Sequence, residues 1–209
     1  TAILLCAIHE EIPKNRQKRP ITLMIPVNLR NYFPSQSMGN FFGWIEVGYK
    51  FEENTSFEQI LESVKEQFRE KLQKDRIAMD MNGYVRLEKN PFVRAVPLEI
   101  KRYFLIAGAN LGGRSITAVY SNIGILKFPP EYKAYIERFG VFASTNSLQV
   151  CSCSYEDQFV VGFTSKIPDD RIQKNFIRML KEEGISCKEE KNEFPGCAEK
   201  QKKEDLKVM

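Results

Sequence analysis

The stretch ITLMIPVNLR, residues 21–30, decides the fold of this chain. Its aliphatic residues occupy every second position from Ile21 to Leu29, and polar residues or Pro26 occupy the positions between them. This alternation is typical of a strand with one buried face. Pro26 has no backbone donor, which favours an edge position or a bulge. The pattern predicts that Arg30 reaches a solvent or cleft surface at the end of the strand.

Helical and strand patterns alternate on both sides of this stretch. The apolar residues of TAILLCAI, 1–8, predict the end of a helix. Because the chain starts at Thr1 inside this apolar run, we expect a preceding segment in the whole protein. After residue 30, a turn-rich segment leads to a strand near residues 42–49. A long amphipathic helix then starts where Thr55 and Glu58 are spaced as a capping box.

The middle of the chain carries weaker signals. A helix is expected over residues 91–110, with Pro97 near a break in it. The sequence SITAVYS, 115–121, predicts a strand that stops at NIG, 122–124, because asparagine and glycine favour turns that end strands. The prolines at 129–130 then predict a turn or loop.

Alternation returns in the last third of the chain. It predicts three neighbouring antiparallel strands at residues 140–145, 148–154 and 158–164, the last two joined as a hairpin. A final helix is expected to start near Pro168 and to stop at Gly184, and it should cover the sheet.

These elements together predict an α/β fold with a mixed, largely antiparallel sheet and helices packed on one face. A chain of 209 residues suits one domain, which we place at residues 1–185. Residues 186–209 are charged and poor in aliphatic side chains, so we expect a loosely ordered tail.

Charge and composition argue against several classes of partner. The net charge of +4 results from 31 basic and 27 acidic residues that are interspersed, which disfavours a nucleic-acid surface. No apolar run is long enough to span a membrane, and no export signal is recognisable, so we expect a cytoplasmic protein. The five cysteines lack zinc-ligand spacing, so reduced thiols and no metal are expected.

Three segments carry a resemblance to a known family: PVNLRNYFPSQSMGNFF at 26–42, VYSNIGILKFPPEY at 119–132, and SYEDQFVVGFTS at 154–165 before the final helix. In order and spacing they resemble the C-terminal lobe of chloramphenicol-acetyltransferase-like, or condensation-domain-like, acyltransferases, in particular the bacterial alcohol acetyltransferase-like branch. The resemblance covers residues 1 to about 185. It implies one lobe of a two-lobe fold in which the lobes meet along a tunnel.

The resemblance implies that the other, N-terminal lobe carries a His-His-x-x-x-Asp motif. Its second histidine would take a proton from an acceptor alcohol or amine, which then attacks an acyl thioester. Acyl-CoA would be the co-substrate, with no tightly bound cofactor. The single histidine here, His9, is not part of such a motif, so we expect no catalytic residue in this chain and no activity of the chain alone. The missing lobe would be a partner, and the lobe interface left exposed is expected to self-associate.

The resemblance also implies roles for residues of the first motif. Arg30 would pair with the aspartate of the histidine motif and so support the active site. A solvated arginine at the end of a strand is the alternative. Gly39 and Asn40 would line the tunnel, where a glycine permits close approach of the substrate. An ordinary loop would explain the same pair.

Ser121, Asn122 and Gly124 of the second motif would lie near the acceptor. An amide there could orient the acceptor or stabilise the charge of an oxyanion, and an Asx turn at the end of a strand is the competing explanation. The run KNRQKR, 14–19, could contact the phosphates of CoA or only solvent. A function of a different class also fits the sequence, namely a non-catalytic module that binds a carrier protein, a partner chain or a hydrophobic ligand.

Overall fold

The structure is a computed structural model, and it describes residues 1–13, 17, 19–112, 115–143, 147–166 and 169–190. Five strands form one sheet in the order β2-β1-β3-β4-β5. They are β1 (Ile21–Asn28), β2 (Phe42–Tyr49), β3 (Ala118–Leu126), β4 (Leu148–Tyr155) and β5 (Gln158–Thr164). The outer pairs β1–β2 and β4–β5 are antiparallel, whereas β3 runs parallel to both of its neighbours. The predicted α/β class with a mixed, largely antiparallel sheet is confirmed.

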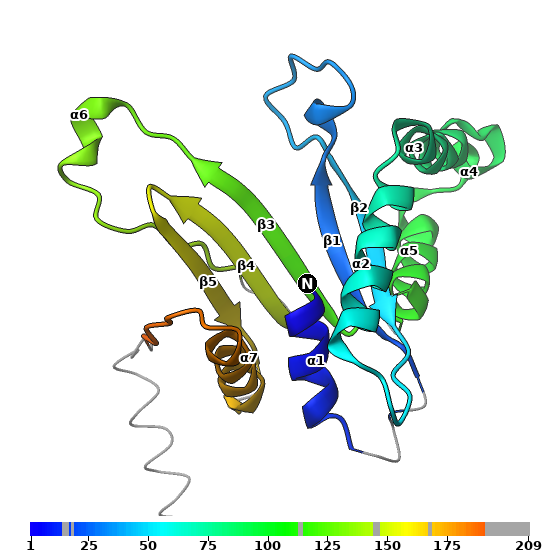
Figure 1. The fold of residues 1–209 in the computed structure, drawn as a ribbon. Helices are drawn as coiled ribbons and strands as arrows, with labels where there is room; N and C mark the ends of the chain where they lie inside the picture. The colour runs from blue at the N-terminus through cyan, green and yellow to red at the C-terminus, as the bar shows by residue number, and fades with distance from the viewer. Residues whose placement is uncertain (14–16, 18, 113–114, 144–146, 167–168, 191–209) are drawn as a thin grey trace, which may run out of the picture.

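The helices α1 (Ala2–Glu11), α2 (Phe57–Lys71) and α7 (Arg171–Glu182) cover one face of this sheet. The other described helices are α3 (Lys74–Lys89), α4 (Pro91–Ala95), α5 (Leu98–Gly112) and α6 (Pro130–Lys133), and a 3-10 turn, η2, follows β1 at Leu29–Asn31. The helix α1 lies between α2 and α7 on the sheet (Figure 1). Apolar side chains of these helices and of the strands share one core, which includes Leu4, Leu5, Leu23, Val47, Ile60, Val64 and Val150.

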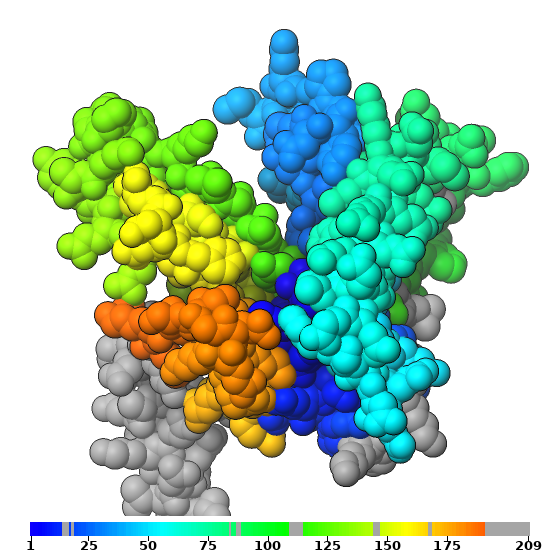
Figure 2. Space-filling view, viewed as in Figure 1, coloured from blue at the N-terminus to red at the C-terminus, as the bar shows by residue number. Residues whose placement is uncertain are grey.

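The strands β1 and β3 pair over two residues only, 23–24 with 118–119, and Pro26 explains why. The N–H of Leu29 donates to Phe41 O in the β1–β2 register, so odd-numbered residues of β1 bond to β2 and even-numbered residues face β3. Pro26 therefore faces β3 without an N–H to donate. Beyond it the two strands diverge, and Figure 2 shows an open notch between the end of β1 and the β3–β5 half.

The free edge of β2 is covered by side chains of α2. The Gln67 side chain accepts a hydrogen bond from Gly48 N–H at 3.1 Å and donates one to Gly48 O at 2.8 Å. Further along the same helix, Lys71 Nζ donates to Glu46 O. An uncovered strand edge would offer these backbone groups to other chains, so the two side chains protect β2 from pairing with them.

The prediction for the start of α2 is wrong by one residue. Its capping box is made by Ser56 and Gln59, not by Thr55 and Glu58. The Thr55 hydroxyl is already used, because it bonds to the backbone N–H and O of Glu52 in the preceding turn. The next helix, α3, was not anticipated, whereas the break near 97 separates α4 from α5 as predicted.

The strand predicted at residues 140–145 is also wrong. Residues 140–143 form no strand, and 144–146 lie outside the described residues. The segment instead crosses the sheet face opposite α7, where Val141 O and the Phe142 ring lie so close to Gly162 of β5 that a Cβ there would sit 2.7–2.8 Å from them. It thereby covers the second face of β4 and β5.

The C-terminal helix ends as predicted, at Gly184 with φ +78°. Residues 186–190 of the predicted tail are described, and Glu190 Oε1 lies 2.7 Å from the Arg138 guanidinium. The remaining tail, 191–209, and most of the run KNRQKR lie outside the described residues. In the described part, no helix combines the length and apolar character required to cross a bilayer.

Candidate functional site

Arg30 holds the loop after β1 in place. It is exposed, as predicted, but the strand ends at Asn28 and Arg30 lies in η2. The turn starts there because Asn28 Oδ1 accepts a hydrogen bond from the Arg30 backbone N–H. Its Nη2 donates to Ser37 O and Gly39 O, both at 2.8 Å. Its guanidinium carbon lies 5.9 Å from the centre of the Phe41 ring. These described contacts use one of the three nitrogens of the guanidinium and hold the loop closed.

Gly39 and Asn40 lie exposed in this loop. Gly39 N–H donates to Ser37 Oγ at 3.1 Å, which fixes the turn. A Cβ at Gly39 would meet only that hydroxyl, at 3.4 Å, so the space in front of the glycine is open. The tunnel-lining role of both residues stays a prediction.

The loop also borders a hollow of about 330 Å³ between the β1–β2 hairpin and α3, and its lining includes the charged residues Glu46, Lys71, Arg76 and Asp80. Leu29, next to Arg30, lines it together with Gly43, Trp44 and Met81. A Cβ at Gly43 would lie 3.4 Å from Leu29 and 3.6 Å from Met81 Sδ. A larger residue at position 43 would therefore reduce the hollow.

The second motif forms a bulge inside β3. The strand continues through NIG instead of stopping there, because Asn122 pairs with Ser152 and Gly124 with Cys153, which leaves Ile123 as the extra residue. Gly124 has φ +83°, and its N–H donates to Asn122 Oδ1 at 2.9 Å. The Asx turn considered as an alternative is therefore present, but within the strand.

The Arg30 loop and the β3 bulge lie on the two strands that flank the notch (Figures 1 and 2). Ser121 and Asn122 lie two and three residues beyond Val119, the last residue of β3 that pairs with β1. Beside them Ile125 is exposed. Within the described residues, no hydrogen bond or ion pair joins Arg30 to the bulge. The notch thus lies between the segment that contains Arg30 and the strand that contains the bulge.

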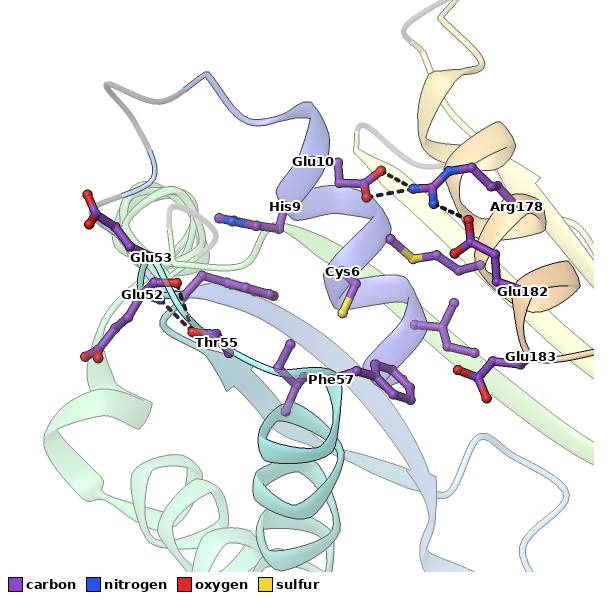
Figure 3. Close-up of a pocket in the computed structure, with 14 residues that line it drawn as sticks. Cys6, His9, Glu10, Glu52, Glu53, Thr55, Phe57, Arg178, Glu182 and Glu183 are labelled. Carbon is purple, nitrogen blue, oxygen red and sulfur yellow. Dashed lines mark hydrogen bonds and ion pairs between the residues drawn. The ribbon is translucent and has the colours of Figure 1, made fainter.

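A separate pocket of about 380 Å³ lies on the helical face, between α1, the start of α2 and the end of α7 (Figure 3). His9 lines it and stacks on Phe51, with ring centroids 3.9 Å apart and ring planes inclined by 5°. Desolvation lowers the pKa of His9 below its ordinary 6.5, and this effect outweighs the negative charge of Glu10, which raises the pKa. The imidazole is therefore neutral at pH 7.

The Cys6 thiol and two of the carboxylates of this pocket are not activated either. Cys6 points into it, and burial, followed by the charge of Glu10, raises the pKa of the thiol to about 11. Glu10 and Glu182 both bind Arg178 with contacts of 2.7 Å. The lining also includes Glu52, Glu53 and Glu183. With a protonated thiol and a neutral imidazole, the cavity is suited to binding and contains no activated thiol or imidazole.

In the described part of the chain, no three His, Cys, Asp or Glu side chains are grouped so that they could hold a metal ion. No protein-family model, no curated protein and no solved structure matches the chain. Its function therefore has to be inferred from the geometry of the notch and from the two segments that flank it.

Proposed function

We propose that this chain is the C-terminal lobe of an acyltransferase, which moves an acyl group from a thioester, acyl-CoA, to an alcohol or amine. The notch between β1 and β3 carries the proposal, because it lies between the two strands that carry the first and second resembling segments. Its flanks hold Arg30 and Asn122, but the only histidine of the chain, His9, lies in the α1 pocket. The base that deprotonates the acceptor must then come from a partner lobe with the His-His-x-x-x-Asp motif.

Arg30 and Asn122 each have N–H groups that make no hydrogen bond within the described residues. Arg30 uses Nη2 for the loop, so the N–H of Nε or an N–H of Nη1 can donate a single hydrogen bond to a carboxylate of the partner lobe and help to position its catalytic segment. Asn122 uses its Oδ1 for Gly124, so its amide NH₂ can donate to the acceptor or to the oxyanion. In this proposal Arg30 is a positioning residue and Asn122 a ligand of the substrate.

A second candidate function is a non-catalytic module that binds a carrier protein, a partner chain or a hydrophobic ligand. The α1 pocket favours it, because Phe51, Phe57 and Ile60 line this cavity and its thiol and imidazole are not activated. For either function we place the protein in the cytoplasm, and we propose that its partners include a second copy of the chain.

Amide chemical-shift mapping of the isotope-labelled chain tests the site. Acetyl-CoA and then octanol are titrated into it, and the proposal expects shifts in residues 28–40 and 120–126. Asn122→Ala should weaken octanol binding about 10-fold, the effect of one hydrogen bond, whereas the control Asn54→Ala in an exposed turn should leave it unchanged. Shifts confined to the α1 pocket would favour the binding module, and their absence from the notch would refute the acyltransferase site.

An activity assay tests whether the general base belongs to a partner lobe rather than to this chain. The chain alone should transfer no acetyl group from acetyl-CoA to octanol, and His9→Ala should change nothing, because His9 stacks on Phe51 in a different pocket. Thioester consumption is followed as release of free CoA. Acetyl transfer by the chain alone would contradict the proposal that the base belongs to a partner lobe.

A further inference from the structure

The α1 pocket combines apolar walls with an excess of negative charge. Phe57, Ile60 and Met179 line it, and Cys6 points into it (Figure 3). The lining also contains five glutamates but only one basic side chain that is charged at pH 7, the guanidinium of Arg178. The whole chain has the opposite balance, with a net charge of +4. The negative charge of the pocket is therefore a local feature that the composition of the chain does not explain.

The single guanidinium is shared by two of these carboxylates. Glu10 and Glu182 both accept hydrogen bonds of 2.7 Å from Arg178. The other two glutamates of the β2–α2 loop and the one at the end of α7 are exposed, and no ion pair within the described residues holds them. These three unpaired carboxylates are Glu52, Glu53 and Glu183. The pocket thus keeps negative charge that the protein itself does not compensate.

The glutamates lie on two sides of the pocket. Figure 3 shows Glu52 and Glu53 on the loop before α2, and Glu183 on the opposite side, at the end of α7. A cleft that has apolar walls and charges of one sign focuses the electric field and concentrates ions of the opposite sign. In the described part of the chain no carboxylate, thiol and imidazole groups are clustered tightly enough to hold a metal ion. The apolar walls instead suit the carbon skeleton of an organic cation.

We propose that the α1 pocket binds an amphipathic amine, a small molecule with an ammonium group on an apolar body. The apolar body lies against Phe57, Ile60 and Met179, where it is removed from water. The ammonium group stays at the mouth of the pocket, near the unpaired carboxylates. The volume of about 380 Å³ is at the lower end of the range for small-molecule sites, so a ligand with a single ring fits. This ligand class rests on the second candidate function, binding in the α1 pocket, and is independent of acyl transfer in the notch.

Three ligands of similar size and different charge test this ligand class: phenylethylamine, which is a cation, phenylethanol, which is neutral, and phenylpropionate, which is an anion. Amide chemical shifts of the full isotope-labelled chain give each dissociation constant at about 20 mM salt. The shifts should fall in residues 3–10, 51–60 and 178–183, which contain the lining of the pocket. The amine should bind about 10-fold more tightly than the alcohol, because each exposed carboxylate adds a small attraction. The anion should bind more weakly than the alcohol.

Replacing the unpaired carboxylates separates charge from shape. Glutamine has nearly the size of glutamate, so the triple variant should bind the alcohol as the wild type does and lose most of the preference for the amine. It combines Glu52→Gln, Glu53→Gln and Glu183→Gln. The matched control removes the same charge from three exposed glutamates that do not line the pocket. It combines Glu70→Gln, Glu99→Gln and Glu137→Gln, and it should keep the preference.

A salt titration of the wild type tests the same point without a substitution. At about 1 M salt the Debye length is about 3 Å, so the amine and the alcohol should bind with nearly equal affinity. Circular dichroism checks that both triple variants are folded, and the salt titration decides the result if one of them is not.

Several results would overturn the amine as ligand: equal affinity for amine and alcohol at low salt, tighter binding of the anion, a preference that survives high salt or the substitutions at the pocket, or its loss in the control variant. Equal binding of amine and alcohol in the pocket would leave the binding module standing. Absence of shifts in the pocket with all three ligands would refute both. Octanol binding in the notch is read at residues 28–40 and 120–126, so failure of the acyltransferase site is distinguished from either result.

Discussion

At the scale of the residue, burial decides which side chains are reactive. Cys6 and His9 lie three residues apart on one face of α1, a spacing that brings a thiol and an imidazole to the same side of a helix. Neither group is activated, because His9 stacks on Phe51 and desolvation raises the pKa of the half-buried Cys6 thiol to about 11.

Cys6 should react slowly with iodoacetamide. At pH 8 we expect a rate about 100-fold below that of free cysteine, because only the thiolate reacts and little of it forms below a raised pKa. The rate should rise with pH towards about 11. Mass spectrometry of the Cys6 peptide measures it, with Glu10→Gln as the comparison, since removing the second cause of the shift should accelerate the reaction. A rate equal to that of free cysteine at pH 8 would contradict this account.

At the scale of the element, the β3 bulge depends on one glycine and one asparagine. Gly124 adopts φ +83°, a region that costs a residue with a side chain about 1–2 kcal/mol. Asn122 satisfies its N–H, so the extra residue Ile123 fits into the strand without an orphaned donor. Asn122 and Gly124 thereby allow the bulge to bend the strand beside the notch.

Gly124→Ala should destabilise the protein by about 1–2 kcal/mol. A Cβ at Gly124 would meet no atom within 4 Å, so the loss would come from the backbone alone. Gly83→Ala is the matched control, because a Cβ there is also free of contacts and position 83 lies inside α3. It should stabilise by about 0.5–1 kcal/mol. Urea denaturation measures both, and effects of equal sign would refute the argument.

The elements that the sequence predicts well are those whose pattern reflects local burial. The strand expected near residues 42–49 is β2 with these bounds, and its residues alternate between exposed and buried positions from Phe42 to Val47. The bulge could not be predicted, because it depends on pairing with β4, and NIG in isolation looks like an end. The strand expected near 140 failed for a similar reason, since Phe142 packs on Gly162 of a distant strand.

The candidate site also has a part that the sequence predicts and a part that it does not. The sequence selected Arg30 and Asn122 from their motifs, and the structure adds what each side chain does locally. The α1 pocket was missed, because it joins Glu10 and Arg178, which are 168 residues apart, and no periodic pattern links them.

At the scale of the whole molecule, α1 joins two halves of the sheet. Leu5 is fully buried in a core that includes Val47 of the β1–β2 half and Val150 of the β3–β5 half. On its other side α1 binds α7 through ion pairs such as Glu10 with Arg178. Since β1 and β3 share little hydrogen bonding, this core provides most of the cohesion between the halves.

Leu5→Ala should destabilise the protein by about 2–5 kcal/mol, the range for a leucine removed from a packed core. Trp44 is the only tryptophan, so its fluorescence reports the β1–β2 half while far-UV circular dichroism reports the whole chain. Both signals should shift together to lower urea. Met38→Ala, at a fully exposed position, should shift neither. Separate transitions in Leu5→Ala would show that the halves unfold independently.

Pro26 has a mechanical consequence for the lobe. Because the β1–β3 ladder stops there, the halves can change their mutual inclination without breaking the antiparallel ladders on either side. The two paired residues before Pro26 act as a pivot, and the apolar contacts of α1 resist its rotation. The width of the opening next to Arg30 and Asn122 is then set by side-chain packing several residues away rather than by the backbone of the flanking strands.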